Sequence, residues 1–345
     1  MAKEIRIQPA QLVDVIHRAL TEAGLPERVA STEAEIMAEA DLCGVPSHGI
    51  RMLPELLRGL QDGRVTANPH VKIIRERPAS CLLDGDNGPG RFVSWQAMRQ
   101  AMERGKRGGI GACLVRRVGH WGRAHAYAYR AAQADMIAIC MTNAIPNMLA
   151  WESKSALLGN NPLAIAVPRG AGREPIVLDL AMSQAAIGKI GTYLREGKKA
   201  PWNWGLDPRG KPSNDPAVIL AAKKVLPFGQ HKGAGLALMI ELLTAALSGG
   251  LLSNEMARAD STGLDSGSSK LFITLDIWAF VDATEFNHRI DDLLAWLQHA
   301  EPGLKILLPG DRGWQMREKY HAEGVPIHGD IVRELKAAGI RLEAK

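Results

Sequence analysis

Apolar and polar positions alternate through the first sixty residues with the period of amphipathic helices. Apolar side chains recur at helical spacing from residue 12 to residue 20, and Pro26 suits the first turn of a second helix. Ser47 is predicted to cap a third helix. Because proline is comfortable only in the first turn of a helix, Pro54 places His48 on the preceding loop or in that first turn.

Strand-like and helix-like runs alternate through the middle of the chain. This alternation predicts a mixed α/β domain in which short strands are separated by helical stretches. The predicted strands span residues 81–83, 112–115, 137–141, 163–167, 176–180 and 271–275, and the predicted helices lie near residues 95–104 and 124–134.

Residues 197–216 are rich in Pro, Gly and Trp and are predicted to form a long loop, a kind of segment that is often functional. An apolar helix is predicted to follow Gly235. Three C-terminal helices are predicted at residues 289–298, 313–323 and 330–338.

Helix-rich ends surround a strand-rich middle, which predicts that the two termini pack together as one domain. On this interpretation residues 1–70 with 285–345 form a helical domain, and residues 71–284 form a mixed α/β domain.

Composition is that of an ordinary globular protein, with 46% hydrophobic and 23% charged residues in a chain of 345. The net charge of +5 is dispersed among acidic residues, and no nucleic-acid-binding motif is recognised, so we expect an anionic small molecule as partner and not a nucleic acid. The longest apolar stretch, residues 233–247, is too short to span a bilayer. Charge precedes any apolar run at the N-terminus and no C-x-x-C pair occurs, so we expect a cytoplasmic protein with reduced cysteines.

Two histidines set among glycines are the candidate groups for chemistry. They occur in Ser47-His48-Gly49 and in Gly119-His120-Trp121-Gly122, and Leu158-Gly159-Asn160-Asn161-Pro162-Leu163 follows them. Imidazole has the side-chain pKa nearest neutrality, and glycine allows a ligand to approach closely, so the pattern suits proton transfer in a tight site.

Several common catalytic patterns are missing from the sequence. It has no G-x-G-x-x-G between a strand and a helix, which argues against a Rossmann dinucleotide site. His120 and His125 are five residues apart and no H-E-x-x-H occurs, so no metal is expected. A G-x-S-x-G nucleophile elbow is also lacking.

In this order, and with Lys232-Gly233, these segments resemble the type-2 malate/L-lactate dehydrogenase family over roughly residues 10 to 330. The resemblance implies a non-Rossmann NAD(P)-binding α/β fold and a homodimer. It also implies hydride transfer between NAD or NADP and a small 2-oxoacid, 2-hydroxyacid or cyclic 2-imino acid, with the proton donor in the helical domain and the cofactor in the mixed α/β domain.

The resemblance also assigns roles to individual residues. His48 is the implied proton donor, Ser47 its hydrogen-bonding neighbour, and Asp179 the carboxylate that orients the imidazole. Some relatives are assigned their acid or base at the position of His120, so the donor is either His48 or His120. The implied cofactor-binding residues are His120, Trp121, Gly122, Arg123, Ala124, Asp179, Leu180, Ala181, His231, Lys232, Gly233, Gly310 and Asp311.

The chain departs from the family pattern at two substrate-binding positions. Many relatives have the substrate arginine four residues after the histidine, where this chain has Met52, and Arg51 lies one position earlier. One residue of offset rotates a side chain by about 100° around a helix. Asn160 replaces a usual threonine, so Arg51, Arg123 and Asn160 are the candidate contacts of the substrate carboxylate.

Two other functions compete with reduction of a small 2-oxoacid. One is reduction of a sugar acid, as in diketogulonate reductase, because Trp121, Trp202 and Trp204 offer aromatic faces that suit carbohydrate rings. The other is dinucleotide binding without turnover, because both substrate-anchor positions differ.

Overall fold

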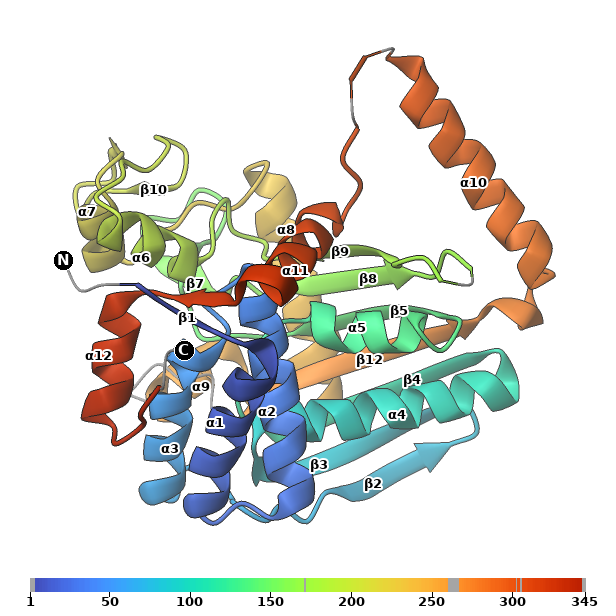
Figure 1. The fold of residues 1–345 in the computed structure, drawn as a ribbon, viewed down its shortest axis with the longest axis horizontal. Helices are drawn as coiled ribbons and strands as arrows, with labels where there is room; N and C mark the ends of the chain where they lie inside the picture. The colour runs from blue at the N-terminus through green and yellow to red at the C-terminus, as the bar shows by residue number, and fades with distance from the viewer. Residues whose placement is uncertain (1–3, 171, 260–266, 302, 305, 343–345) are drawn as a thin grey trace.

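A mixed seven-stranded sheet forms the centre of the protein, shown as a computed structural model in Figure 1. The structure describes residues 4–170, 172–259, 267–301, 303–304 and 306–342. The strand order is β2-β3-β4-β12-β5-β8-β9, in which β3 and β4 are parallel and the other neighbours are antiparallel. These strands are β2 (Lys72–Arg77), β3 (Ser80–Gly88), β4 (Ile110–Val118), β5 (Met136–Thr142), β8 (Leu163–Val167), β9 (Ile176–Leu180) and β12 (Ser268–Asp276).

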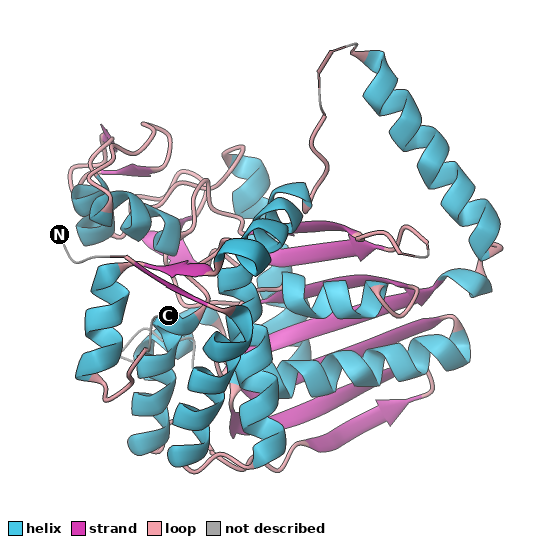
Figure 2. Cartoon of the chain, in the orientation of Figure 1, coloured by secondary structure: helices cyan, strands magenta, loops and turns pink. Residues whose placement is uncertain are grey.

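Helices surround this sheet, and short strands pair outside it (Figure 2). The α-helices are α1 (Pro9–Glu22), α2 (Glu27–Leu42), α3 (Leu53–Gln61), α4 (Gly90–Gly108), α5 (His125–Ala132), α6 (Ile187–Arg195), α7 (Pro216–Ala222), α8 (His231–Glu241), α9 (Ser253–Ala259), α10 (Ala283–Ala300), α11 (Asp311–Glu323) and α12 (Gly329–Ala337). The 3₁₀ turns are η1 (Ile50–Met52) and η3 (Ile277–Ala279), and η2 (Leu242–Ala246) is a π-helical turn. The short strands are β1 (Ile5–Ile7), β6 (Met148–Leu149), β7 (Ala156–Leu158), β10 (Gly205–Leu206), β11 (Pro212–Ser213) and β13 (Val325–Ile327).

The sheet is covered on both faces, because alternate side chains of its strands belong to different cores. In β4, Cys113 and Val115 pack in the larger core with Ala97 of α4. Leu114, which lies between them, packs in a smaller core with Ala237 of α8. This is the two-residue alternation that a strand between two layers requires. Helices α4 and α5 lie side by side on one face, and α2 packs over them.

The two ends of the chain meet beside the sheet. Strand β1 pairs antiparallel with β13, with Ile5 opposite Ile327, and α12 packs against α3. Figure 1 shows these segments next to α1 and α2. The boundaries at residues 70 and 285 stay a prediction.

Most predicted elements are confirmed, and two predictions at helix starts are wrong. The strands at 163–167 and 176–180 coincide with β8 and β9, and the other predicted strands lie inside β3, β4, β5 and β12. Ser47 does not cap a third helix, since η1 intervenes and α3 begins at Leu53. The apolar helix begins at His231 and not after Gly235; glycines within its first turns weaken the helical signal.

The predicted long loop is only partly irregular. Residues 197–216 contain the β10–β11 pair, and Trp204 at its centre is buried in a third apolar cluster with Ile190 and Ile219. Helices α6 and α7, which the sequence pattern did not reveal, supply those two isoleucines.

Helix α10 stands away from the rest of the protein in Figure 1, and every one of its side chains is at least partly exposed. Among the described residues, we find no helix that is both long and apolar enough to cross a membrane.

Candidate active site

His48 lies on the loop between α2 and η1, as Pro54 predicts, and a buried aspartate shapes that loop. Asp41 accepts a hydrogen bond from the backbone N–H of Ile50 at 2.6 Å. A Cβ on Gly49 would overlap with the carboxyl group of Asp41, so glycine is required after the histidine. Burial raises the pKa of Asp41 to about 7, against the lowering effect of that hydrogen bond.

His120 lies on the loop that joins β4 to α5, and the loop is fixed through its backbone. Lys270 of β12 donates a hydrogen bond to the carbonyl of Gly119 at 3.1 Å. The N–H of Gly122, a residue with a φ of 75°, donates to Nδ1 of His120 at 3.1 Å. When the ring is neutral its proton therefore lies on Nε2, which leaves Nε2–H as a donor.

The structure brings the two histidines together from these separate loops. Their ring centroids are 5.8 Å apart with an interplanar angle of 30°, and both side chains are partly buried. Burial, followed by the charge of Arg123, lowers the pKa of His48 to about 4, and burial lowers that of His120 well below its usual range. Both imidazoles are therefore neutral near pH 7.

Ser47 and Asp179 form hydrogen bonds with different partners. A hydrogen bond of 2.9 Å joins Oγ of Ser47 to Nδ1 of His48. Asp179 instead accepts a hydrogen bond from Nε of Arg123 at 3.0 Å, and among the described residues no hydrogen bond joins Asp179 to His48. The charge of Asp179 raises the pKa of His48, so the two groups are close enough to interact, and the orientation of the imidazole by Asp179 stays a prediction.

Both candidate substrate arginines lie near His48. The side chain of Arg123 is 15% exposed, and its charge lowers the pKa of His48 more than any other charge does. Arg51 lies in η1, and its charge also lowers the pKa of His48, though by less. Its charge lowers the pKa of Arg195 in α6 as well.

The Gly-Asn-Asn-Pro segment is held by hydrogen bonds of both asparagines. The side-chain oxygen of Asn160 accepts from Asn147 at 3.1 Å, which occupies part of its capacity to bind a substrate. Asn161 is fully buried, and its amide donates to the carbonyl of Ala237 at 2.8 Å and to Glu241 at 3.0 Å. Asn161 therefore ties the segment to α8, a structural role that the sequence did not separate from binding.

Two of the predicted cofactor segments, residues 179–181 and 231–233, lie close together at the start of α8. Gly233 allows close packing, because a Cβ there would lie 2.6 Å from the carbonyl oxygen of Met182. Met182 follows the segment 179–181 and accepts a hydrogen bond from the N–H of Phe228 at 3.0 Å. His231 and Lys232 are exposed in the first turn of α8, where their side chains are available to an anion. The backbone N–H groups of Lys232 and Gly233 already donate to the carbonyls of Gly229 and Phe228.

The remaining cofactor segments include side chains that are already engaged. Trp121 is 2% exposed and packs against Tyr127 and Phe272, so its indole offers no surface to a ligand. Asp311 accepts a hydrogen bond from the N–H of Leu308 at 2.9 Å, which caps the turn before α11. The adjacent Pro309 accepts from Val177 of β9, and this bond places residues 310–311 beside the strand of Asp179.

Sequence reasoning missed a buried ion pair beneath the histidine loops. Arg91 in α4 donates to Glu33 in α2 at 3.2 Å, and the two side chains are 3% and 0% exposed. Removing one partner of such a pair typically costs about 3–5 kcal/mol. The sequence does indicate that Arg91 is buried. It lies at helical spacing from the buried residues Ser94 and Met98, and so falls on the buried face of its helix.

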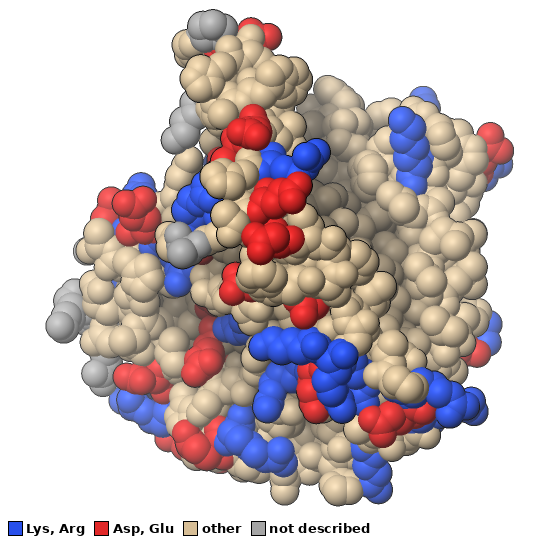
Figure 3. All heavy atoms as spheres, turned by 90° about the vertical axis from the view of Figure 1, so that its right-hand side faces the viewer, with Lys and Arg blue, Asp and Glu red and all other residues tan. Residues whose placement is uncertain are grey.

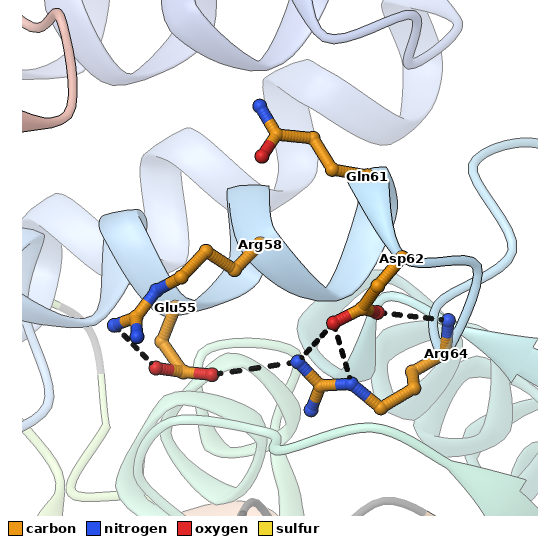
Figure 4. A pocket seen from close by; sticks show the side chains of 5 residues that line it. All are labelled: Glu55, Arg58, Gln61, Asp62 and Arg64. Carbon is orange, nitrogen blue, oxygen red and sulfur yellow. Dashed lines mark hydrogen bonds and ion pairs between the residues drawn. The ribbon is translucent and has the colours of Figure 1, made fainter.

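A surface hollow beside α3 is not a candidate active site. It is lined by Glu55, Arg58, Gln61, Asp62 and Arg64, and the charged groups pair with one another, as Figure 4 shows. None of the predicted site residues lines it. In the part of the chain that the structure describes, no three His, Cys, Asp or Glu residues are grouped so as to hold a metal ion.

Comparisons with known proteins agree with this fold. The model of the malate/L-lactate dehydrogenase family matches residues 7–336. The chain is 33% identical to a malate dehydrogenase of Pyrococcus abyssi, over 99% of this chain and 96% of that protein. It is 34% identical to an L-sulfolactate dehydrogenase of Methanocaldococcus jannaschii, over 96% of this chain and 95% of that protein. The structure of a Δ1-piperideine-2-carboxylate reductase of Pseudomonas syringae matches with a TM-score of 0.86 and 30% identity, over 96% of this chain and 99% of that one.

The chain belongs to the malate/L-lactate dehydrogenase family. It is therefore an oxidoreductase of the dehydrogenase and reductase class, and the family implies a nicotinamide dinucleotide cofactor.

Proposed function

We propose that this enzyme transfers hydride between NAD or NADP and a small 2-oxoacid, with the matching 2-hydroxyacid as the reduced product. Cyclic 2-imino acids form the second substrate class, because they present the same carboxylate beside a reducible C=N bond. The observation that supports this most is the contact between the rings of His48 and His120 beside Arg123. It combines a proton-transfer group with a cation suited to a carboxylate.

In the proposed reaction, His48 transfers the proton and Ser47 holds its ring. The imidazole of His48 gives a proton to the carbonyl oxygen during reduction and accepts it during oxidation, and Ser47 fixes the ring through Nδ1. His48 is neutral near pH 7, so it has to gain a proton before it can donate one. The negative charge of the bound substrate raises the pKa of His48 and so favours this protonation. His120 is the alternative donor through Nε2–H.

The residues at the start of α8 fit a dinucleotide. Gly233 packs closely on Met182, and the exposed side chain of Lys232 in the first helical turn offers a cation to a phosphate. The segment 179–181 ends next to the start of α8, and residues 310–311 lie beside β9. When bound, the nicotinamide supplies or accepts the hydride.

A panel of substrates tests this function directly. We expect purified enzyme to oxidise NADH or NADPH with at least one of pyruvate, oxaloacetate, diketogulonate, an oxidised ureidoglycolate and a cyclic 2-imino acid. The initial rate of loss of reduced-nicotinamide absorbance measures this. Dinucleotide binding by fluorescence without turnover of any substrate in the panel would refute the proposed substrate classes.

Reduction of a sugar acid is less well supported by the structure than by the sequence. Trp121 and Trp204 are both buried, at 2% and 6% exposure, whereas Trp202 is 61% exposed. Only one of the three aromatic faces is thus available to a carbohydrate ring.

We propose that the enzyme is a homodimer, and two apolar surfaces support this. Large side chains of α8, of η2 and of the residue after it, including Leu236, Met239, Leu243 and Leu247, are 39–62% exposed. In the projecting helix α10, Trp296 is 65% exposed. Figure 3 shows that charged side chains are unevenly spread over one face of the protein, with a broad area that carries few of them. Exposed apolar patches of this kind mark protein contacts.

Light scattering tests the dimer. We expect the wild-type protein to have twice the mass of one chain, and Leu247→Glu to shift it toward a single chain, because a charge would have to be buried in the contact. Leu194→Glu is the matched control, since Leu194 is also exposed but lies on α6. A single-chain mass for the wild-type protein would refute the homodimer.

We also propose that the enzyme is cytoplasmic. All four cysteines are buried and unpaired, which fits a reducing compartment.

A further inference from the structure

The guanidinium group of Arg91 lies at the junction of α2, α4 and the His48 loop. Its Nη1 donates to Oε2 of Glu33 at 3.2 Å, and its Nη2 donates to the backbone carbonyl of His48 at 3.2 Å. The same Nη2 is 3.8 Å from the sulfur of Met52. These contacts join both ends of the turn that carries His48 to the first turn of α4.

On its other side, the first turn of α4 contacts the His120 loop. A Cβ on Gly122 would lie 3.0 Å from Nε of Arg91, so the bare backbone of Gly122 permits this contact. Gly90 packs more closely still, because a Cβ there would overlap with the carbonyl groups of Gly119 and His120. The start of α4 thus contacts both histidine loops at once.

We propose that Arg91 is a positioning residue, which fixes the His48 loop against the His120 loop so that the two imidazoles share one site. This inference rests on the proposed function, because it gives Arg91 a role in the same reaction. Arg91 is 2% exposed and lies beneath the loops, so it acts through the histidines and not on the substrate.

The charge of Arg91 reaches both imidazoles. It lowers the pKa of His48 and of His120, and it is the cation common to the surroundings of both rings. The other groups that act on them are Arg123, Arg51 and Asp179 for His48, and His48 and Lys270 for His120. Removing the positive charge of Arg91 should therefore raise both pKa values, since the protonated rings would no longer be repelled by it.

Histidine titration by NMR tests this in the full chain, with His48→Asn and His120→Asn variants to assign the signals. The variant is Arg91→Gln combined with Glu33→Gln, because Arg91→Gln alone would leave a buried carboxylate without its partner. We expect both titration midpoints to move to higher pH, because Arg91 acts on both rings, whereas Glu33, whose negative charge is removed with it, is not among the groups named above. Arg91→Lys keeps the charge and should stay nearer to wild type.

Arg104→Gln is the matched control. Arg104 is buried on the same helix and forms an ion pair with Glu76, away from the histidine loops. Its loss should destabilise the protein without moving either histidine midpoint. Unchanged midpoints in the double variant, or an equal shift in Arg104→Gln, would overturn the inference.

The pH profile of kcat/KM for reduction gives a second readout. A protonated imidazole is needed for reduction, so a raised pKa should extend activity to higher pH in the double variant. Misplaced loops should also lower the maximal kcat about tenfold in the double variant and, to a smaller degree, in Arg91→Lys. If wild-type enzyme reduces none of the substrates, the proposed function fails, while the NMR titration still decides the role of Arg91.

Discussion

Replacing His48 with asparagine should lower kcat by roughly 10²- to 10⁴-fold while leaving dinucleotide affinity nearly unchanged. The imidazole is neutral, partly buried and held by Ser47 at 2.9 Å, so the substitution removes proton transfer and keeps a polar side chain of similar reach. The groups at the start of α8 that would bind phosphate are untouched. Steady-state kinetics with saturating dinucleotide, together with fluorescence titration of NADH and NADPH, measures the two effects separately.

Two further histidine variants decide between the candidate donors. His120→Asn should lower kcat less than His48→Asn, because the candidate substrate anchor Arg123 acts on His48 and is not among the groups named for His120. His17→Asn is the control, since His17 is on α1 and hydrogen-bonded to the exposed Glu27. If His48→Asn keeps at least half of wild-type turnover while His120→Asn loses it, the donor is His120.

Replacing Arg123 with alanine should raise KM for the acid substrate about 10- to 100-fold, which is the loss of a charge-assisted hydrogen bond of roughly 1.5–3 kcal/mol. Arg51→Ala should have a much smaller effect. Of the two arginines, Arg123 has the stronger influence on His48, and Asp179 holds its guanidinium in place. Inhibition constants for oxamate, a carboxylate without a reducible ketone, measure the same contact apart from catalysis.

The chain offers a close control for Arg123→Ala. Arg130 is on α5 and pairs with Glu39 at 2.6 Å, and these side chains are 20% and 17% exposed, compared with 15% and 17% for Arg123 and Asp179. Arg130→Ala should therefore lose a similar ion pair without changing KM. An unchanged KM for Arg123→Ala beside a large rise for Arg51→Ala would assign the substrate carboxylate to Arg51.

Local patterns in the sequence predicted most of the central sheet. Short, nearly continuous apolar runs locate β8 and β9 at their bounds, because each strand has to present side chains to a core on both sides. The glycine-rich start of α8 was misread, since the packing of Gly233 on Met182 compensates for its low helix propensity and cannot be seen locally. The pairing of β1 with β13 joins segments some 320 residues apart and leaves no local signal.

The sequence predicted which residues form the candidate site, but it did not predict most of the contacts between them. The order of the glycine-flanked motifs selected His48, His120 and Arg123, which the structure places together. The sequence could not show that Asp179 accepts a hydrogen bond from Arg123, because that contact depends on how β9 packs against the loop before α5. Arg91 was missed because a charged residue near glycine resembles a surface turn until its helix is packed.

Transfer of a labelled hydride tests the central claim most directly. The enzyme should be incubated with NADH or NADPH deuterated at the transferring position and with the substrate that gives the highest rate in the panel, and the product analysed by mass spectrometry. The account predicts one deuterium atom on the former carbonyl or imine carbon, formed by wild-type enzyme and far more slowly by His48→Asn. Dinucleotide binding with no deuterium in any product would contradict it.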